Sequence, residues 1–280
     1  SGKDWDSARR QGGLHILPPF GLKDNVLYNT RLEALRGAKN FLERSNEEYV
    51  VMTDCDSINR INYSEVLEYH VRNRADMTLV YKKFDNGTYS AKNATTFNVN
   101  ANGRITAVNY HERLEDKHAN VFTNVFVMKK SLLQNIVMDS MSHGKRHFMT
   151  DVIADSVNSL KIMGYEYKGF YAGITSLQAY YDSNLLMLDE KVRHEVFGDR
   201  SVFTKIRDSA PAKYGNGAIV KNSMIADGCV IEGEVENSIL FRNVKVARGA
   251  VIKNSIVMQN SVIGENATLN CIIADKNVKW

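Results

Sequence analysis

The sequence has few cysteines and no long apolar run. Its three cysteines, Cys55, Cys229 and Cys271, lie far apart, and no Cys-x-x-Cys pair occurs. This spacing supports neither a disulfide framework nor a zinc site, and it favours the reducing cytoplasm as the location. No apolar stretch approaches the ~20 residues of a membrane span. The first 20 residues carry charges and two prolines instead of a signal-peptide core.

An excess of one charge sign is also absent. The 36 Lys and Arg residues outnumber the 32 Asp and Glu residues by a formal charge of +4, which is spread along the chain. Proteins that bind nucleic acids usually cluster their basic residues, so we expect no nucleic-acid partner. The balance suits small anions such as sugar phosphates and nucleotides.

Residues 1–200 alternate strand-like and helix-like segments. Short apolar runs predict strands at 48–53, 77–81 and 121–128. Longer segments predict helices at 64–74, 150–163 and 176–196, the first with Ser64 as its N-cap. Such alternation predicts an α/β domain with a mainly parallel sheet covered by helices.

The pattern changes after about residue 211, where aliphatic residues recur at every sixth position. This period, with turn formers between the aliphatics, predicts residues 217–280 to be a left-handed parallel β-helix of hexapeptide repeats, with 201–216 as a linker. An ordinary antiparallel β-domain is the alternative, but its strands should alternate with a period of two. The three series are Ile219, Ile225, Ile231; Leu240, Val246, Ile252; and Val251, Val257, Ile263, Leu269.

The segments at residues 5–6, 12–13 and 16–19 (Trp-Asp, Gly-Gly and Ile-Leu-Pro-Pro) resemble a loop of the bacterial ADP-glucose pyrophosphorylases, also called glucose-1-phosphate adenylyltransferases. The resemblance implies a Rossmann-like sugar-nucleotidyltransferase domain followed by a β-helix. That family joins ATP to glucose 1-phosphate with the help of Mg²⁺ and releases pyrophosphate, to supply glycogen synthesis. The opening at Ser1 reads as the interior of a loop, so we expect a natural segment before it.

One landmark of this family is retained. Residues 51–63 resemble the family's strand that ends in Gly-Asp-His-Ile-Tyr, and the spacing places the catalytic aspartate at Asp56. A carboxylate at a strand end can hold Mg²⁺ between phosphates, which makes Asp56 a weak metal candidate. Without the family resemblance, Asp54 and Asp56 are two acidic residues at a strand end. Such residues are more often solvated or capping than catalytic.

Other landmarks depart from the family pattern. Tyr110 and His111 stand where the family has Glu-Lys, and Gly173 stands where it has a second metal-binding aspartate. His111 is more often a surface histidine than a replacement for the lysine charge. Arg31 and Leu32 replace small residues of the sugar-reading loop. This chain also has no Gly-rich phosphate loop ending in Gly-Thr-Arg.

The vestigial site resembles that of the regulatory, non-catalytic subunit of Gram-positive bacteria, which needs no cofactor of its own. The resemblance implies a mixed tetramer with a catalytic subunit, although a homo-oligomer is possible. It also implies sugar-phosphate effectors, for which Arg9, Arg10, Lys39 and Arg44 are candidates beside a merely solvated basic face. The alternatives are an active nucleotidyltransferase with a rearranged site and a hexapeptide acyltransferase. The acyltransferase needs a histidine near the coils, but the last one is His194.

Overall fold

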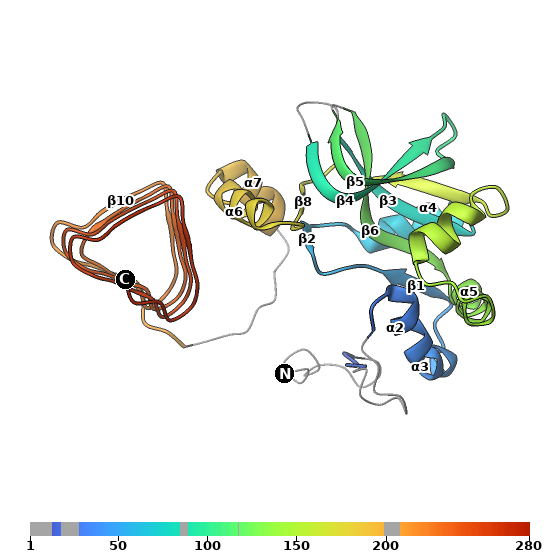
Figure 1. The fold of residues 1–280 in the computed structure, drawn as a ribbon, viewed down its shortest axis with the longest axis horizontal. Coiled ribbons are helices and arrows are strands. Elements are labelled where there is room, and N and C mark those ends of the chain that lie inside the picture. Colours follow the sequence, from blue (N-terminus) through green and yellow to red (C-terminus); the bar gives the residue numbers. More distant parts are fainter. Residues whose placement is uncertain (1–12, 18–27, 85–88, 117, 199–207) are drawn as a thin grey trace. The chain divides into compact units, whose positions relative to one another are not determined.

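The computed structural model describes residues 13–17, 28–84, 89–116, 118–198 and 208–280, with the backbone alone at 89–93 and 112–116. The chain forms two compact units (Figure 1). The first comprises Ser1–Ser57 and Ile61–Tyr171, and the second comprises Ile58–Arg60 and Ala172–Trp280. In the described part of the chain, no helix is long and apolar enough to cross a membrane.

The first unit is built on a six-stranded sheet. Five strands follow the order β5-β4-β6-β3-β7, and β1 pairs with β6. The strands are β1 (Tyr49–Met52), β3 (Met77–Phe84), β4 (Tyr89–Val99), β5 (Ile105–Asp116), β6 (Ala119–Lys129) and β7 (Ile162–Glu166).

The α/β class predicted from the sequence is confirmed, but the sheet is mixed rather than mainly parallel. Within this sheet, only β3 and β7 pair in parallel, and the other pairings of its described strands are antiparallel. One reason is that β4 and β5 form a hairpin, joined by the short connection at residues 100–104. Strands joined by a tight turn must run antiparallel, whereas a parallel pair needs a long crossover.

Helices cover both faces of this sheet. They are α2 (Arg31–Gly37), α3 (Lys39–Arg44), α4 (Tyr63–Arg72), α5 (Lys130–Ser142) and a π-helix at Met149–Ala154. The predicted helix at 64–74 is confirmed, but its N-cap is Asn62, whose side chain accepts from the Ser64 N–H. The predicted helix at 150–163 ends early, because Ile162 begins strand β7.

Strand β3 shows why the core has two sides. Residues 77–81 are all at most 8% exposed, because alternate side chains point to opposite faces. Met77 and Leu79 pack with Leu32 and Leu133, from α2 and α5. Val80 packs with Val66 of α4. A strand buried on both faces reads as a continuous apolar run, which made it visible in the sequence.

His70 of α4 is a buried titratable group in this core. Its side chain is 1% exposed, its Nδ1 lies 2.9 Å from the Thr78 hydroxyl, and its Nε2 has no partner among the described residues. Burial lowers the pKa of His70, opposed by the nearby Asp76 carboxylate and reinforced by Lys129. Protonation therefore favours the unfolded chain.

We expect the free energy of unfolding to fall as the pH drops below the ordinary histidine pKa of about 6.5. The unfolded state takes up the proton first, so stability is lost until the pH reaches the lowered pKa of folded His70. Urea unfolding above and below this window checks the expectation. His70→Gln should flatten the profile, whereas His194→Gln, at an exposed histidine of the second unit, should not. An unchanged profile in His70→Gln would contradict the assignment.

The second unit contains the predicted β-helix, which is confirmed as a parallel structure. Three four-stranded parallel sheets form its sides, in the orders β9-β12-β15-β18, β10-β13-β16-β19 and β11-β14-β17-β20. The strands are β9 (Lys213–Tyr214), β10 (Ile219–Lys221), β11 (Met224–Ile225), β12 (Val230–Ile231), β13 (Glu234–Glu236), β14 (Ile239–Leu240), β15 (Lys245–Val246), β16 (Val251–Lys253), β17 (Ile256–Val257), β18 (Val262–Ile263), β19 (Thr268–Asn270) and β20 (Ile273–Ala274).

The coils are shorter than three complete six-residue repeats. Val220 pairs with Val235, which pairs with Ile252 and so with Leu269, giving steps of 15, 17 and 17 residues. The shorter coil turns its corner with two residues, Glu232-Gly233, where the other coils use four. A Cβ at Gly233 would clash with the carbonyl oxygen of Ala250, which makes glycine necessary there.

Two predicted inward residues lie outside the core, because successive inward residues are not always six positions apart. Ile219 is 44% exposed and Val251 is half-buried, while Val220 and Ile252 beside them face inward. The remaining members of the three series face the interior as predicted. The corners carry asparagines in the left-handed region, such as Asn222, Asn237 and Asn254 with φ of 41°, 48° and 47°. Asparagine tolerates this conformation better than most residues.

Two helices belong with the β-helix in the second unit: α6 (Leu177–Leu186) and α7 (Glu190–Phe197). The continuous helix predicted at 176–196 is therefore broken, because Asp189 caps a new helix by accepting from the N–H groups of Lys191 and Val192. They lie within the predicted first domain, 1–200, while of the predicted linker only 208–216 is described. Strand β8 (Tyr171–Gly173) pairs with β2 (Ser57–Asn59), and the last two residues of each belong to this unit.

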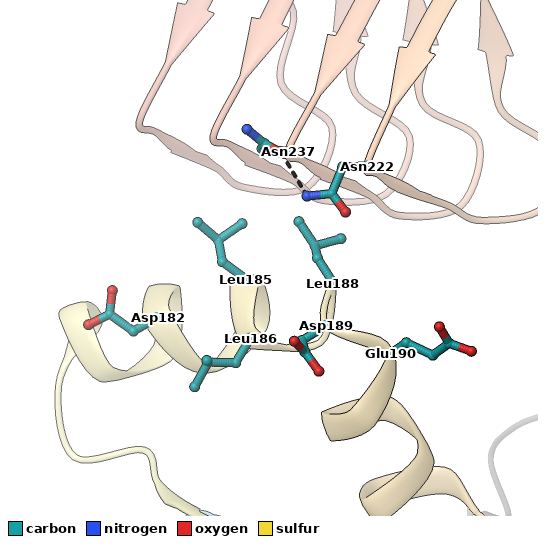
Figure 2. A pocket seen from close by; sticks show the side chains of 8 residues that line it. All are labelled: Asp182, Leu185, Leu186, Leu188, Asp189, Glu190, Asn222 and Asn237. Atoms are coloured by element: carbon teal, nitrogen blue, oxygen red, sulfur yellow. Dashed lines mark hydrogen bonds between the residues drawn. The ribbon is translucent and has the colours of Figure 1, made fainter. Parts of the chain in front are cut away.

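Helix α6 covers one side of the β-helix. Ile239 and Ile256 alternate with the inward Leu240 and Val257, yet they are only 8% and 0% exposed. The Tyr181 hydroxyl of α6 donates to the carbonyl oxygen of Asn254, at the corner just before Ile256. Figure 2 shows Leu185 and Leu188 pointing from the helical segment toward the asparagine corners. We infer that the outward isoleucines are buried by α6.

Candidate functional site

The first unit contains a cavity of about 840 Å³. Its wall comes from the start of α2, the loop after β1, the β4-β5-β6 strands and the start of the π-helix. The polar and charged residues of its lining include Arg31, Asp54, Tyr110, Asn124, His147 and Thr150.

The position of α2 is fixed by a capping box. The Thr30 hydroxyl accepts from the N–H of Glu33, and the Glu33 carboxylate accepts from the N–H of Asn29. At the other end, the Arg36 guanidinium donates to the carbonyl oxygens of Ser140 and Lys145, which ties α2 to the end of α5. Arg31, at the start of α2, is thereby held at the cavity wall.

An ion pair occupies part of the cavity wall. The Arg31 Nη2 lies 2.5 Å from the Asp54 Oδ1, with side chains 21% and 37% exposed. The Arg31 guanidinium also lies over the Phe126 ring, 5.2 Å from its centroid. Asp54 is therefore neutralised by a neighbour that is itself fixed by packing. Leu32, expected beside Arg31 in the same space, is instead fully buried in the core.

The predicted site residues separate in the structure. Tyr110 lines the cavity, whereas its neighbour His111 is outside the lining, with its Nε2 2.9 Å from the Thr96 hydroxyl. Asp56 is exposed on the loop after β1 and does not line the cavity. Gly173 ends β8 and belongs to the second unit.

The effector candidates are also spread out. Arg9 and Arg10 lie outside the described residues. Lys39 and Arg44 belong to the short helix α3, where Lys39 pairs with Glu43 at 3.7 Å and Arg44 is an exposed residue of the last turn. A cation there also stabilises the negative end of a helix, so Arg44 has a structural explanation.

Sequence patterns did not point to Asn124, which lines the cavity from within β6. Its φ of 61° is left-handed, in a strand where neighbouring residues are extended. The register between β3 and β6 shifts at the opposite position, between Leu79 and Tyr81. Backbone strain of this kind concentrates at ligand sites, and only an asparagine inside an apolar run could have signalled it.

His147 and Thr150 are positioned by a carboxylate outside the lining. Asp151 accepts from the backbone N–H groups of Arg146 and His147 and from the Thr150 hydroxyl. The His147 N–H contributes most, and together these bonds lower the pKa of Asp151 to about 2. Asp151 therefore organises this edge as an anion and is not available as a proton donor near neutral pH.

The described residues do not fit a Mg²⁺ ion. No group of three or more His, Cys, Asp or Glu side chains in this part of the chain could hold a metal. Mg²⁺ usually needs one or two carboxylates together with phosphates, and the only carboxylate in the cavity lining, Asp54, is paired with Arg31.

The second unit contains a segment that matches a known protein family. Residues 209–280 match the family model described as GlmU-like, C-terminal hexapeptide. This match covers the coils from β9 to the last residue.

Relatives match nearly the whole chain. A glucose-1-phosphate adenylyltransferase of Acetivibrio thermocellus is 29% identical over 98% of this chain and 65% of its own length. The glycogen biosynthesis protein GlgD of Bacillus subtilis is 29% identical over 100% of this chain and 71% of its own length. A glucose-1-phosphate adenylyltransferase of Geobacillus stearothermophilus is 28% identical, and the chain spans 66% of it. The predicted resemblance to the glucose-1-phosphate adenylyltransferase family is thereby confirmed over nearly the whole of this chain.

Proposed function

We propose that this chain is a regulatory or structural subunit of a glucose-1-phosphate adenylyltransferase in glycogen biosynthesis and does not itself catalyse the reaction. A catalytic subunit of the same family joins ATP to glucose 1-phosphate, and the two kinds of subunit form a mixed tetramer that responds to sugar phosphates. The three free cysteines suit the cytoplasm as its location.

The observation that carries this proposal is the ion pair between Arg31 and Asp54. A cavity for two anionic substrates needs carboxylates for a metal and cations for phosphates. Here the lining carboxylate and the lining guanidinium neutralise each other. Tyr110 lines the cavity where the family has a glutamate, whereas His111 and Gly173, which lie outside the lining, stand where it has a lysine and an aspartate.

The names of the relatives agree with this role. The chain is as similar to a protein named for glycogen biosynthesis, GlgD, as it is to one named for the adenylyltransferase activity. The ion pair between Arg31 and Asp54 and the uncharged Tyr110 in the cavity favour the first of these roles.

A second candidate is an active nucleotidyltransferase with a rearranged site. It is favoured by the exposure of Asp56, which leaves that carboxylate accessible after β1, and by the open cavity of about 840 Å³ nearby in the same unit.

We expect Asp56→Asn in this chain to leave kcat of the mixed complex within about threefold, which corresponds to a small change in activation free energy. The physical reason is that the chemistry takes place in the partner's site. The measurement is steady-state synthesis of ADP-glucose by the purified mixed complex, with assembly checked by light scattering.

The matched control carries the equivalent Asp→Asn change in the catalytic partner only, which should lower kcat by at least ~10²-fold. A hundredfold fall caused by Asp56→Asn in an assembled complex would show that this chain's own site is used. That result would favour the second candidate.

A further inference from the structure

A groove of about 680 Å³ lies between α6, the start of α7 and the asparagine corner of the first coils. Its lining contains three leucines and three carboxylates, those of Asp182, Asp189 and Glu190, and no cation. Figure 2 shows Asp182 on one side of the leucines and Glu190 on the other. This acidic groove therefore combines an apolar floor with negative charge at both of its ends.

The carboxylates of the acidic groove are not neutralised by neighbours. No ion pair in the described part of the chain includes any of the three. Asp189 accepts from two backbone N–H groups of α7, and Asp182 accepts from the Gln178 amide, so these bonds leave the negative charges in place. Leu186, between them in the sequence, is 47% exposed. The complement of such a groove is an aliphatic surface that carries cations.

One of the three sides of the β-helix is such a surface. In the sheet β9-β12-β15-β18, the outward position of successive coils holds lysine and valine in alternation, while their strand neighbours point into the core. Coils stack at the inter-strand spacing, so successive lysines of the column lie roughly 10 Å apart. This lysine face consists of Lys213, Val230, Lys245, Val262 and Lys279.

The lysine face keeps its charge, unlike the other two sides. None of its lysines belongs to an ion pair among the described residues. At the corner that follows, Glu232 and Arg248 offset each other. On the β10-β13-β16-β19 side, Lys253 pairs with Glu236 at 3.1 Å. The β11-β14-β17-β20 side turns buried isoleucines outward, against α6. Only the lysine face therefore offers unpaired cations beside an exposed aliphatic residue, Val262, which is 36% exposed.

We propose that the acidic groove of one chain binds the lysine face of a second copy. Three carboxylates then meet three ammonium groups, and exposed aliphatic side chains meet between them. Opposite charges steer such an encounter and fix its register. Because the groove and the face are different surfaces, the contact is heterologous, and it makes a ring if the rotation closes and a filament if it does not. The contact needs only this chain, so it does not rest on the function proposed above.

Charge exchange between the two surfaces tests this contact in the full chain. Lys213→Glu with Lys245→Glu makes the face negative, and Asp182→Lys with Glu190→Lys makes the groove positive while Asp189 still caps α7. Each double variant should self-associate at least about tenfold more weakly than the parent, because like charges then meet. Light scattering at tens of micromolar measures association, and circular dichroism checks the fold. Mixed in equal amounts, the two variants should associate again, since each groove then meets a face of opposite sign.

The matched control is Lys221→Glu with Lys253→Glu, which makes the same change of net charge on the β10-β13-β16-β19 side. It should leave association within about twofold of the parent, and raising NaCl from about 50 to about 500 mM should weaken association of the parent. The proposal is overturned if the parent stays monomeric, if either charge-reversed variant associates like the parent, if the control weakens association as much, or if the mixture stays as dissociated as its components. Catalytic activity is not measured, so the outcome is separate from that of Asp56→Asn.

Discussion

Assayed without a catalytic partner, the protein is expected to make ADP-glucose at least ~10²–10³-fold more slowly than the Geobacillus relative under the same conditions, because the loss of one pre-organised charge contact costs about that factor. In this chain the charges expected at Tyr110, His111 and Gly173 are absent, and Asp54 is paired with Arg31. The measurement is steady-state turnover with ATP, glucose 1-phosphate and Mg²⁺, using the protein with any natural sequence before Ser1 included.

A turnover above ~1 s⁻¹, which is ordinary for an enzyme, would contradict the non-catalytic role. The converse test restores the missing charges. Tyr110→Glu, His111→Lys and Gly173→Asp, introduced together, should raise a low rate if these positions explain the loss. Arg31→Ala added to the triple variant would release Asp54 and test the ion pair separately.

The largest effect on stability is expected at Ile252. Its side chain is fully buried in the column with Val235 and Leu269, so Ile252→Asn removes apolar contacts and buries an amide without a partner. We expect the free energy of unfolding to fall by about 3–5 kcal/mol, within the range for large core truncations and unsatisfied polar groups. Urea unfolding followed by circular dichroism measures the change.

Ile219→Asn is the matched control for this substitution. Both positions are isoleucines in strands of the same sheet, and the period of six predicts that both face inward. Because Ile219 is 44% exposed, its replacement should cost less than about 1 kcal/mol. Equal destabilisation by the two variants would show that the register of the coils is wrong.

The local sequence pattern was sufficient to predict those segments in which the burial of each residue follows from the polarity of its own side chain. The β-helix could be predicted because every coil must direct apolar residues inward, which imposes a short, regular period on the sequence. The buried strands β3 and β6 were predictable for a similar reason, and the strand predicted at 48–53 is β1, which is half-buried apart from the exposed Val51. A strict period of six could not show that Val220 and Ile225, which both face inward, are only five residues apart, and this shorter step leaves Ile219 outward.

The direction of the strands in the first unit lay beyond local pattern. Strand β4 and helix α5 were not predicted, and without β4 neither its hairpin with β5 nor its antiparallel pairing with β6 could be inferred. Sheet direction depends on how connections cross in space, and a strand's own residues look much the same in either direction.

The candidate site also has features that the sequence determines and features that only the tertiary structure determines. The sequence by itself determined that this chain has carboxylates at Asp54 and Asp56 and lacks one at Gly173. These facts depend only on the identity of each residue and not on the fold. Only the tertiary structure decided that Asp54 rather than Asp56 lines the cavity and that Arg31 neutralises it. The same is true of Lys213 and Lys245, which lie 32 positions apart in the sequence and share one face of the β-helix. Two coils bring them into one column, and such proximity arises only when the chain folds back on itself.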